Sequence, residues 1–221
     1  MIDWSSIDTV LLDMDGTLLD LHYDNHFWNI QLPKLYADQH AISAAEAHEH
    51  LHGAYANERG TLQWYCLDHW SERLRMDIPT LKRTVANKIA LRPHVSEFLQ
   101  RIKASNRDLL LVTNAHQTTL EIKMEVVDIQ PWFDRVVVSH ALNAPKEDQD
   151  FWHRLQALHP FDPARTLLID DTESILEAAS TYGIAHLLTL LQPDSQQEMR
   201  STTRFPAIHH FNEIMPTESP Q

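Results

Sequence analysis

The stretch Val10-Leu11-Leu12-Asp13-Met14-Asp15-Gly16-Thr17-Leu18-Leu19-Asp20 decides the fold of this chain. Its apolar start is typical of a buried parallel strand, and an open α/β sheet places its chemistry at the carboxyl ends of such strands. A turn at Gly16 lets Asp13 and Asp15 face one crevice, where one carboxylate can attack an electrophile while the other handles protons. Taken alone, the stretch is better explained as a strand followed by an ordinary Asp-Gly turn.

Three later segments change this interpretation. They are Leu109-Leu110-Leu111-Val112-Thr113-Asn114, Pro145-Lys146-Glu147-Asp148 and Thr166-Leu167-Leu168-Ile169-Asp170-Asp171-Thr172. The first supplies a hydroxyl at Thr113, and the second supplies a cation at Lys146. The third supplies two adjacent carboxylates, Asp170 and Asp171, and the first and third segments each end a predicted strand.

In this order the four segments resemble the motifs of the haloacid dehalogenase superfamily. Those motifs are an Asp-x-Asp-Gly-Thr strand end, a strand-terminal Ser or Thr, a Lys, and an acidic pair. The intervals between the motifs also fit, so the resemblance extends over the whole chain, although each short motif is weak by itself. The resemblance implies an α/β, Rossmann-like fold.

Five apolar segments predict a parallel five-stranded sheet of order 3-2-1-4-5: residues 9–13, 109–113, 136–139, 166–170 and 186–190. Helical spacing of apolar residues precedes the second predicted strand, at 93–104, and separates the last four, at 116–128, 147–158 and 173–182, which implies right-handed crossovers. This order puts the first strand in the middle, between the strands that carry Thr113 and Asp170. The polar groups are therefore expected to meet at one edge of the sheet.

About ninety residues separate the first two predicted strands, far more than one crossover requires. They show helical patterns at 25–31, 34–39, 43–57, 63–76 and 79–90. Ser43 and Glu46 predict a capping box, and Pro33 should break the first stretch in two. The resemblance identifies this segment as an inserted α-helical cap, which predicts a core of residues 1–20 and 92–221 and a cap of residues 21–91. Such a lid excludes water when it closes over a substrate.

A chain of 221 residues can hold one sizeable domain or a core domain with an insertion, and its hydrophobic content of 43% is ordinary for a globular protein. The chain has no apolar N-terminal segment behind a basic flank and no long uncharged run, so a cytoplasmic location without membrane contact is expected. The formal net charge of -13 and the lack of a Lys/Arg block disfavour nucleic acid as a partner. A phosphorylated substrate must then be held locally, by a divalent cation and by single lysines.

Some cysteine and histidine residues also suggest sites. The lone Cys66 lies in an aromatic stretch and is interpreted as a buried or cleft-lining thiol rather than a nucleophile. His48 and His52 share a helix face without an evident third ligand, which favours a solvated surface over a metal site. His116 either lines the pocket or begins a helix.

The resemblance implies phosphoryl transfer through an aspartyl-phosphate. In that mechanism Asp13 attacks phosphorus, and Asp15 protonates the leaving alkoxide and later takes a proton from the hydrolytic water. Lys146 neutralises Asp13 and a phosphate oxygen. Thr113 and backbone N–H groups near Asn114 hold the remaining phosphate oxygens.

The resemblance also implies Mg²⁺ as cofactor. Its oxygen ligands would be the Asp13 side chain, the Asp15 backbone carbonyl and Asp171, with water completing an octahedron. Asp170 would act through water, because the second acidic residue of the pair usually takes the direct position in this family.

Each assignment has a simpler alternative. Lys146 alone is typical of an exposed surface lysine, and Thr113 of a turn cap. Asp170 or Asp171 can cap the helix that begins at Glu173. The complete ordered set of motifs favours the functional interpretation.

Asp15 discriminates within the superfamily, because a dehalogenase needs no leaving-group acid at that position. A phosphatase is therefore predicted. The alternatives are a phosphatase for phosphoglycolate or a sugar phosphate, and a phosphosugar mutase that returns the phosphoryl group to its sugar. A non-enzymatic ligand-binding protein on the same fold is the third alternative.

The cap segments 24–28 and 61–70, together with 113–116 and 145–149, resemble the bacterial GMP/IMP nucleotidase group of the superfamily. That resemblance implies a small phosphorylated metabolite as substrate, a purine nucleoside 5′-monophosphate. Asn25, Trp28 and Trp64 are the candidates for contact with the base. The cap aromatic residues are more simply explained as the cap's own core.

Overall fold

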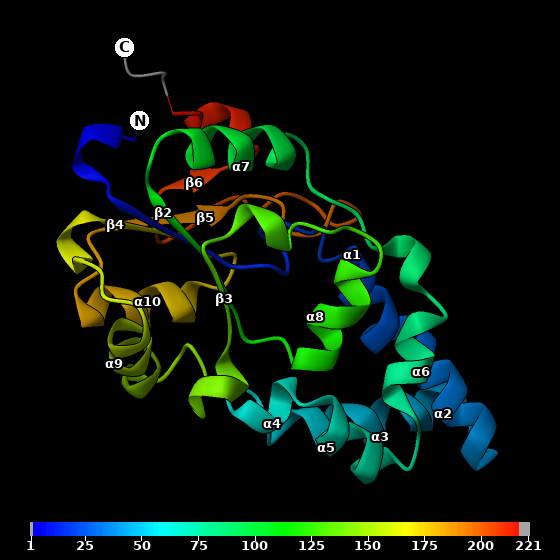
Figure 1. Ribbon diagram of the computed structural model, residues 1–221. Coiled ribbons are helices and arrows are strands. Elements are labelled where there is room, and N and C mark those ends of the chain that lie inside the picture. Colours follow the sequence, from blue (N-terminus) through cyan, green and yellow to red (C-terminus); the bar gives the residue numbers. More distant parts are fainter. Residues whose placement is uncertain (1, 217–221) are drawn as a thin grey trace.

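A sheet of six parallel strands, in the order β3-β2-β1-β4-β5-β6, forms the centre of the computed structural model (Figure 1). The structure describes residues 2–216. The strands are β1 (Thr9–Leu12), β2 (Asp108–Thr113), β3 (Arg135–Val138), β4 (Thr166–Ile169), β5 (His186–Leu190) and β6 (Ala207–Ile208). The predicted order of the first five strands is confirmed, and β6 is an addition, because two residues are too short for a recognisable pattern.

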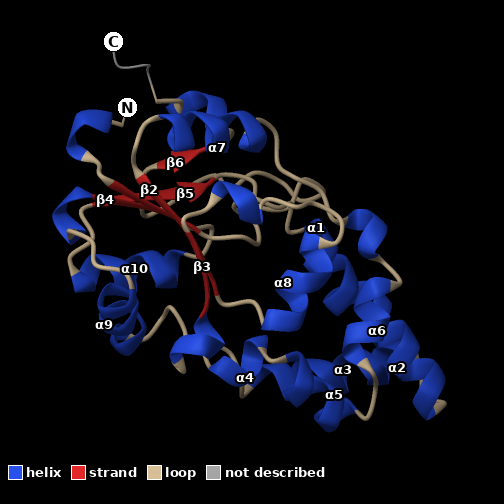
Figure 2. Cartoon of the chain, viewed as in Figure 1, coloured by secondary structure: helices blue, strands red, loops and turns tan. Residues whose placement is uncertain are grey.

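Helices surround this sheet and form a separate group beside it (Figure 2). Their bounds are α1 (His22–His26), α2 (Leu32–His40), α3 (Ala44–Ala56), α4 (Leu62–Tyr65), α5 (Leu67–Leu74), α6 (Ile78–Arg83), α7 (Val95–Ala104), α8 (Gln117–Met124), α9 (Gln149–Leu158) and α10 (Glu173–Tyr182). Within residues 2–216, no helix combines the length and the apolar character needed to cross a membrane.

Both faces of the sheet are buried. Val10 and Leu12 of β1 join the apolar cluster that contains α7, whereas Leu11 joins the cluster that contains α9 and α10. Figure 1 shows α7 on one side of the sheet and α9 with α10 on the other. Side chains on a strand alternate between its faces, so a run of apolar residues is needed when both faces are covered. This explains why β1 is apolar at every position after Thr9.

The helical group is joined to the sheet by two neighbouring chain segments. Leu19 and Leu91 form an antiparallel bridge. The backbone N–H of Asp20 donates to the carbonyl of Ala90 at 2.9 Å, and that of Arg92 donates to Leu18 at 2.9 Å. These paired segments lie at the predicted ends of the cap, residues 21–91.

Three details of the predicted cap helices are corrected by the structure. Pro33 does not break the first helix, which continues through a π-helical turn at Phe27–Gln31 into α2. Proline has no N–H to donate to the residue four positions earlier, and the wider π-helical turn before it does not require that hydrogen bond. The predicted helix 63–76 is interrupted at Cys66, whose extended backbone (φ -82°, ψ 112°) ends α4 and starts α5. The predicted helix 79–90 ends at Arg83 in α6, before a 3₁₀ turn at Ala86–Lys88. The capping box of Ser43 and Glu46 is confirmed.

Candidate active site

Three buried carboxylates lie together at the carboxyl ends of β1 and β4. Each of Asp13, Asp170 and Asp171 offers an oxygen within 4.8 Å of the other two. Asp13 directly follows β1 and the acidic pair directly follows β4, and these strands are adjacent and in register. The sheet therefore brings together two acidic motifs that are far apart in the sequence.

Lys146 is the counter-charge inside this group. Its side chain is fully buried, and its Nζ donates to Asp13 Oδ1 at 2.6 Å, to Asp170 Oδ2 at 2.7 Å and to the carbonyl of Val112 at 3.1 Å. Burial alone would lower the pKa of Lys146, but the carboxylates of Asp13 and Asp170 outweigh it and raise that pKa above its ordinary value. Lys146 is consequently a permanent cation rather than the exposed surface lysine of the alternative interpretation.

One ammonium group does not balance these carboxylates. Burial raises the pKa of Asp13 to about 6 despite Lys146, with Asp170 adding to the rise. Burial, together with repulsion from Asp13 and Asp170, also raises the pKa of Asp171 well above its ordinary value. Arg200 approaches Asp171 only at 3.8 Å. The excess negative charge on clustered oxygen ligands fits a hard divalent cation such as Mg²⁺.

Gly16 leaves the space that the Asp171 carboxylate occupies. Gly16 has φ +82°, and a Cβ atom on it would lie 2.7 Å from Asp171 Cγ. Thr17, the next residue, accepts a hydrogen bond from the backbone N–H of Asp171 at 3.1 Å. The Gly-Thr pair of the first motif therefore positions the acidic pair of the fourth.

Gly16→Ala should lower the free energy of unfolding by roughly 3 kcal/mol, because positive φ is strained for alanine and the methyl group displaces Asp171. Gly60→Ala is the matched control, since Gly60 has nearly the same φ, +80°, with nothing within 4 Å of its Cβ position. The control should cost about 1 kcal/mol from φ strain alone. Urea denaturation measures both. Equal losses would contradict the role given to Gly16.

Thr113 and Asn114 organise the loop between the sheet and Lys146. Thr113 Oγ1 accepts from the N–H of Ala115 at 3.0 Å, which leaves its own hydroxyl proton for an anion. Asn114 Oδ1 accepts from the backbone N–H of Lys146 at 2.9 Å, and its Nδ2 donates to Glu147 Oε2 at 2.9 Å. Thr113 thus caps a turn, as in the alternative interpretation, and its hydroxyl proton is still free to be donated.

Asp15 belongs to a second buried charge cluster. Lys123 of α8 binds Asp15 and also Asp24 Oδ2 at 2.5 Å. The other oxygen of Asp24 accepts from Lys82 Nζ at 2.8 Å. Burial raises the pKa of Asp15 to about 6, and Asp24 and Asp13 add to that rise against Lys123. A carboxyl group with such a pKa can both give and take a proton near neutrality.

This second cluster was not found from the sequence. Lys82 and Lys123 are almost completely buried, and a buried lysine carries no local signature of its own. The only hint in the sequence is that Lys123 lies between two apolar residues, Ile122 and Met124. The structure shows that all three are buried in α8. Asp24 begins the cap and Lys123 belongs to the core, so the cluster joins the two parts of the chain beside Asp15.

The three candidate base contacts make their interactions elsewhere in the cap and core, apart from Trp28, whose ring centroid lies 5.4 Å from Lys82 Nζ. Asn25 Nδ2 donates to Asp194 Oδ2 at 2.7 Å. Trp28 and Trp64 both pack edge-on against Trp70, in the aromatic core of the cap. The simpler explanation of these tryptophans as cap core agrees with these contacts, and their contact with a substrate base stays a prediction.

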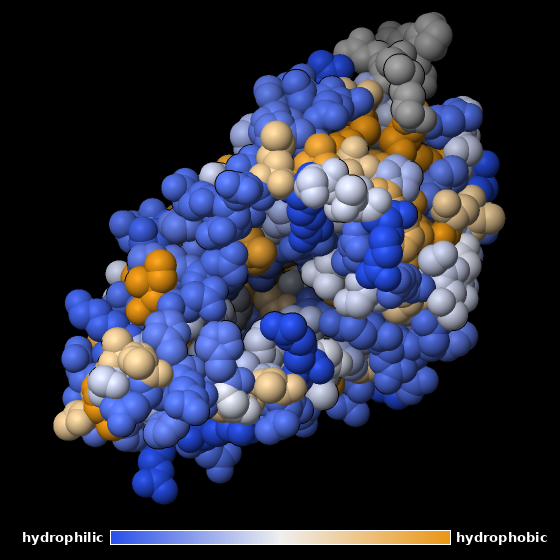
Figure 3. All heavy atoms as spheres, turned by 180° about the vertical axis from the view of Figure 1, so that it is seen from behind, coloured by the Kyte–Doolittle hydropathy of each residue, from blue (hydrophilic) through white to orange (hydrophobic). Residues whose placement is uncertain are grey.

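A different cap residue reaches the core loop. Tyr65 donates its hydroxyl to Glu147 Oε1 at 2.7 Å, and Glu147 also binds Asn114. This contact could not be predicted from the sequence, because Tyr65 and Glu147 are far apart in the chain. Glu147 lies in the segment 145–148, but only Lys146 of that segment has a predicted role. Figure 3 shows a hollow near the middle of the molecule, between the helical group and the part built on the sheet.

Comparison with known proteins places these observations in a family. A family model described as haloacid dehalogenase-like hydrolase matches residues 7–183. The GMP/IMP nucleotidase YrfG of Escherichia coli (strain K12) is 38% identical over 216 residues, which cover 98% of this chain and 97% of that protein. The same figures hold for the protein of that name from Shigella flexneri.

Solved structures share the fold. The HAD phosphatase from Thermococcus onnurineus superposes with a TM-score of 0.74 at 19% identity, over 94% of this chain and 95% of that one. The HAD-hydrolase YfnB from Bacillus subtilis, a structure bound to magnesium, gives a TM-score of 0.64 at 18% identity, over 94% and 96% of the two chains. At these identities the likeness concerns the fold alone.

Proposed function

Because this chain belongs to the haloacid dehalogenase-like hydrolase family, we propose that it hydrolyses purine nucleoside 5′-monophosphates, GMP and IMP, to nucleoside and phosphate. The observation that carries the substrate class is 38% identity to a GMP/IMP nucleotidase along nearly the whole of both chains. The matched region includes both the core and the cap. The proposal assigns the choice of substrate to the cap.

Asp13 is the proposed nucleophile. Its carboxylate lies 2.6 Å from Lys146, and this ion pair keeps Asp13 more ionised than burial alone would allow. Attack on phosphorus would transfer the phosphoryl group to Asp13 and release the nucleoside alkoxide, which takes a proton from Asp15. Asp15 would then accept a proton from the water that hydrolyses the aspartyl-phosphate. Lys146 and the Thr113 hydroxyl are the proposed donors to phosphate oxygens.

The Asp13 side chain, the backbone carbonyl of Asp15 and Asp171 are the proposed direct holders of a Mg²⁺ ion, with Asp170 acting through water. The clustered oxygens of the three side chains and their unbalanced charge support this assignment. When bound, Mg²⁺ would neutralise phosphate charge and orient the phosphoryl group. The indirect role of Asp170 agrees with its contacts, because its two oxygens already accept from Lys146 and from the N–H of Thr172.

Asp15→Asn should slow the hydrolysis of alkyl phosphates by about 10²-fold or more, and that of aryl phosphates much less. The physical reason is that a phenolate leaves without a proton, whereas a sugar alkoxide does not. Steady-state kcat/KM for a series of esters of rising leaving-group pKa measures the effect, because it covers only the steps through release of the leaving group and not the later hydrolysis of the aspartyl-phosphate, which is common to every ester. Circular dichroism checks the folding. A loss of the same size for every ester would contradict the role of Asp15 as an acid.

The substrate class is tested by phosphate release across nucleoside monophosphates, sugar phosphates and phosphoglycolate. GMP and IMP should give the highest kcat/KM. If phosphoglycolate or a hexose phosphate exceeded them by more than about tenfold, or about 1.4 kcal/mol of transition-state preference, the nucleotide claim would be wrong and the phosphatase would remain. The matched pair GMP and ribose 5-phosphate isolates the contribution of the base.

A further inference from the structure

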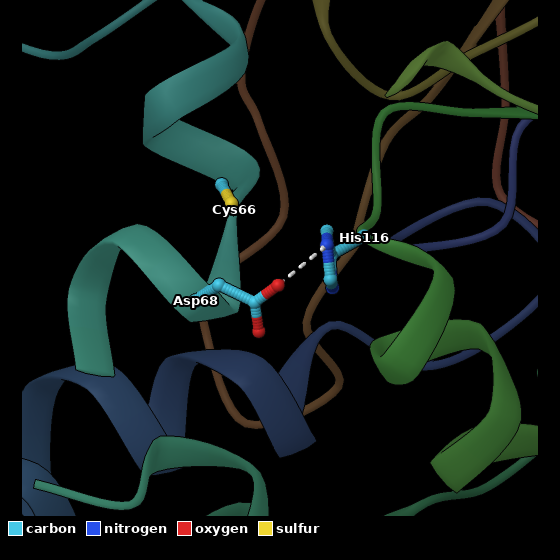
Figure 4. A group of neighbouring side chains, drawn as sticks. All are labelled: Cys66, Asp68 and His116. Atoms are coloured by element: carbon cyan, nitrogen blue, oxygen red, sulfur yellow. Dashed lines mark ion pairs between the residues drawn. The ribbon is translucent and has the colours of Figure 1, made fainter. Parts of the chain in front are cut away.

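Cys66, Asp68 and His116 meet at the junction of the cap and the core (Figure 4). Cys66 lies between α4 and α5, Asp68 is in the first turn of α5, and His116 precedes α8 on the core side. Each offers a ligand atom within 4.8 Å of the other two, and Asp68 Oδ2 lies 3.7 Å from His116 Nε2. This group shares no residue with the carboxylates around Lys146.

The ligand types indicate a transition metal rather than Mg²⁺. A thiolate, a carboxylate and a neutral imidazole carry two negative charges together, which matches a divalent ion. Thiolate is a soft ligand that Mg²⁺ avoids, while Zn²⁺ and Co²⁺ accept sulfur, nitrogen and oxygen together. We propose that Cys66, Asp68 and His116 form a binding site for Zn²⁺ or a similar thiophilic divalent ion, and that the bound ion fastens the cap to the core.

All three side chains are available for such an ion. Asp68 is 78% exposed, which gives a metal an open path from solvent. Cys66 is half-buried, and its sulfur makes one weak contact, accepting from the N–H of His69 at 3.5 Å. His116 caps no backbone group of α8, and its Nδ1 has no hydrogen-bond partner among residues 2–216. An ion would bind without breaking a strong existing interaction.

The occupied site would restrain the opening of the cap. Cys66 and Asp68 belong to the cap, whereas His116 follows β2, whose end carries Thr113. Metal–ligand bonds across this junction would add to the hydrogen bond between Tyr65 and Glu147, which joins the same part of the cap to a different core loop, the one before α9. Since a substrate must enter and a product must leave beneath the cap, a filled site should slow turnover.

The single cysteine permits a direct spectroscopic test with Co²⁺ on the whole protein. Titration in a thiol-free buffer should produce a near-ultraviolet thiolate-to-cobalt charge-transfer band that Zn²⁺ abolishes. Cys66→Ser should lack the band while keeping an N-cap acceptor for α5. Asp68→Asn and His116→Ala should each weaken Co²⁺ binding by about tenfold or more. The exposed Glu72→Gln, also on α5, is the matched control and should bind as the wild type does.

The proposed site would be overturned if millimolar Co²⁺ gave no band with the wild type. Equal affinity in wild type, Asp68→Asn and His116→Ala would also overturn it, because the ion would then be held by the thiol alone. Neither outcome depends on the nucleotidase proposal, since no substrate is used.

The effect on the cap is measured separately, with an aryl phosphate at saturating Mg²⁺. Zn²⁺ should inhibit wild type and Glu72→Gln alike, and inhibition of Cys66→Ser should require at least about tenfold more Zn²⁺. Equal inhibition of wild type and Cys66→Ser would contradict the restraint, because Zn²⁺ would then act at the carboxylates around Lys146.

Discussion

Asp13→Asn is expected to lower phosphate release from GMP by about 10³-fold or more. The neutral amide is a poor nucleophile, and it also removes the carboxylate to which Lys146 donates at 2.6 Å. The chain should still fold, because asparagine has the same size and Lys146 keeps its bond to Asp170. Initial rates in a coupled phosphate assay measure the loss, and circular dichroism with urea denaturation measures the fold.

Asp8→Asn provides the matched control for this variant. Asp8 immediately precedes β1 and pairs with Arg165, but its side chain is exposed and far along the strand from the site. Its activity should stay within about twofold of wild type, as is usual for a surface substitution. If Asp13→Asn kept more than a tenth of the wild-type rate while folding normally, Asp13 could not be the nucleophile.

Lys146→Met should lower both the activity and the stability. Methionine fills a similar volume but leaves the carboxylates of Asp13 and Asp170 buried without their cation. Breaking a buried ion pair from one side costs about 3 kcal/mol of unfolding free energy. The turnover number should fall by about 10²-fold, because both the proposed nucleophile Asp13 and a phosphate oxygen lose their charge partner.

The double variant Asp13→Asn with Lys146→Met separates the two contributions to stability. In Lys146→Met the carboxylates of both Asp13 and Asp170 are buried without a cation. The double variant replaces the carboxylate of Asp13 with a neutral amide and leaves only that of Asp170 unpaired, so it should be more stable than Lys146→Met by about 1 kcal/mol. Urea denaturation of the four proteins completes the cycle. Strictly additive losses would mean that Asp13 and Lys146 do not interact in the folded protein.

Much of the fold could be predicted because its signals are local. The five predicted strands agree with β1 to β5 to within one residue at each end, since apolar runs between polar residues mark buried parallel strands directly. Parallel order then brings Asp13 and Asp170 to the same edge of the sheet, which explains why short motifs located the three clustered carboxylates and Lys146.

The remaining features depend on contacts between distant residues. Nothing near Lys123 in the sequence indicates that its partners are Asp15 and Asp24, about a hundred residues earlier. The break at Cys66 is similar, because its neighbours have helical spacing and only the extended backbone at this one residue separates α4 from α5.

The central claim is that a phosphoryl group passes through Asp13 before it reaches water. The stereochemical course at phosphorus tests this most directly, with a nucleoside thiophosphate made chiral by oxygen isotopes and hydrolysed in isotopically labelled water. Two successive in-line displacements predict net retention of configuration in the released thiophosphate. Net inversion would show that water attacks the ester in one step, and would contradict the covalent role of Asp13.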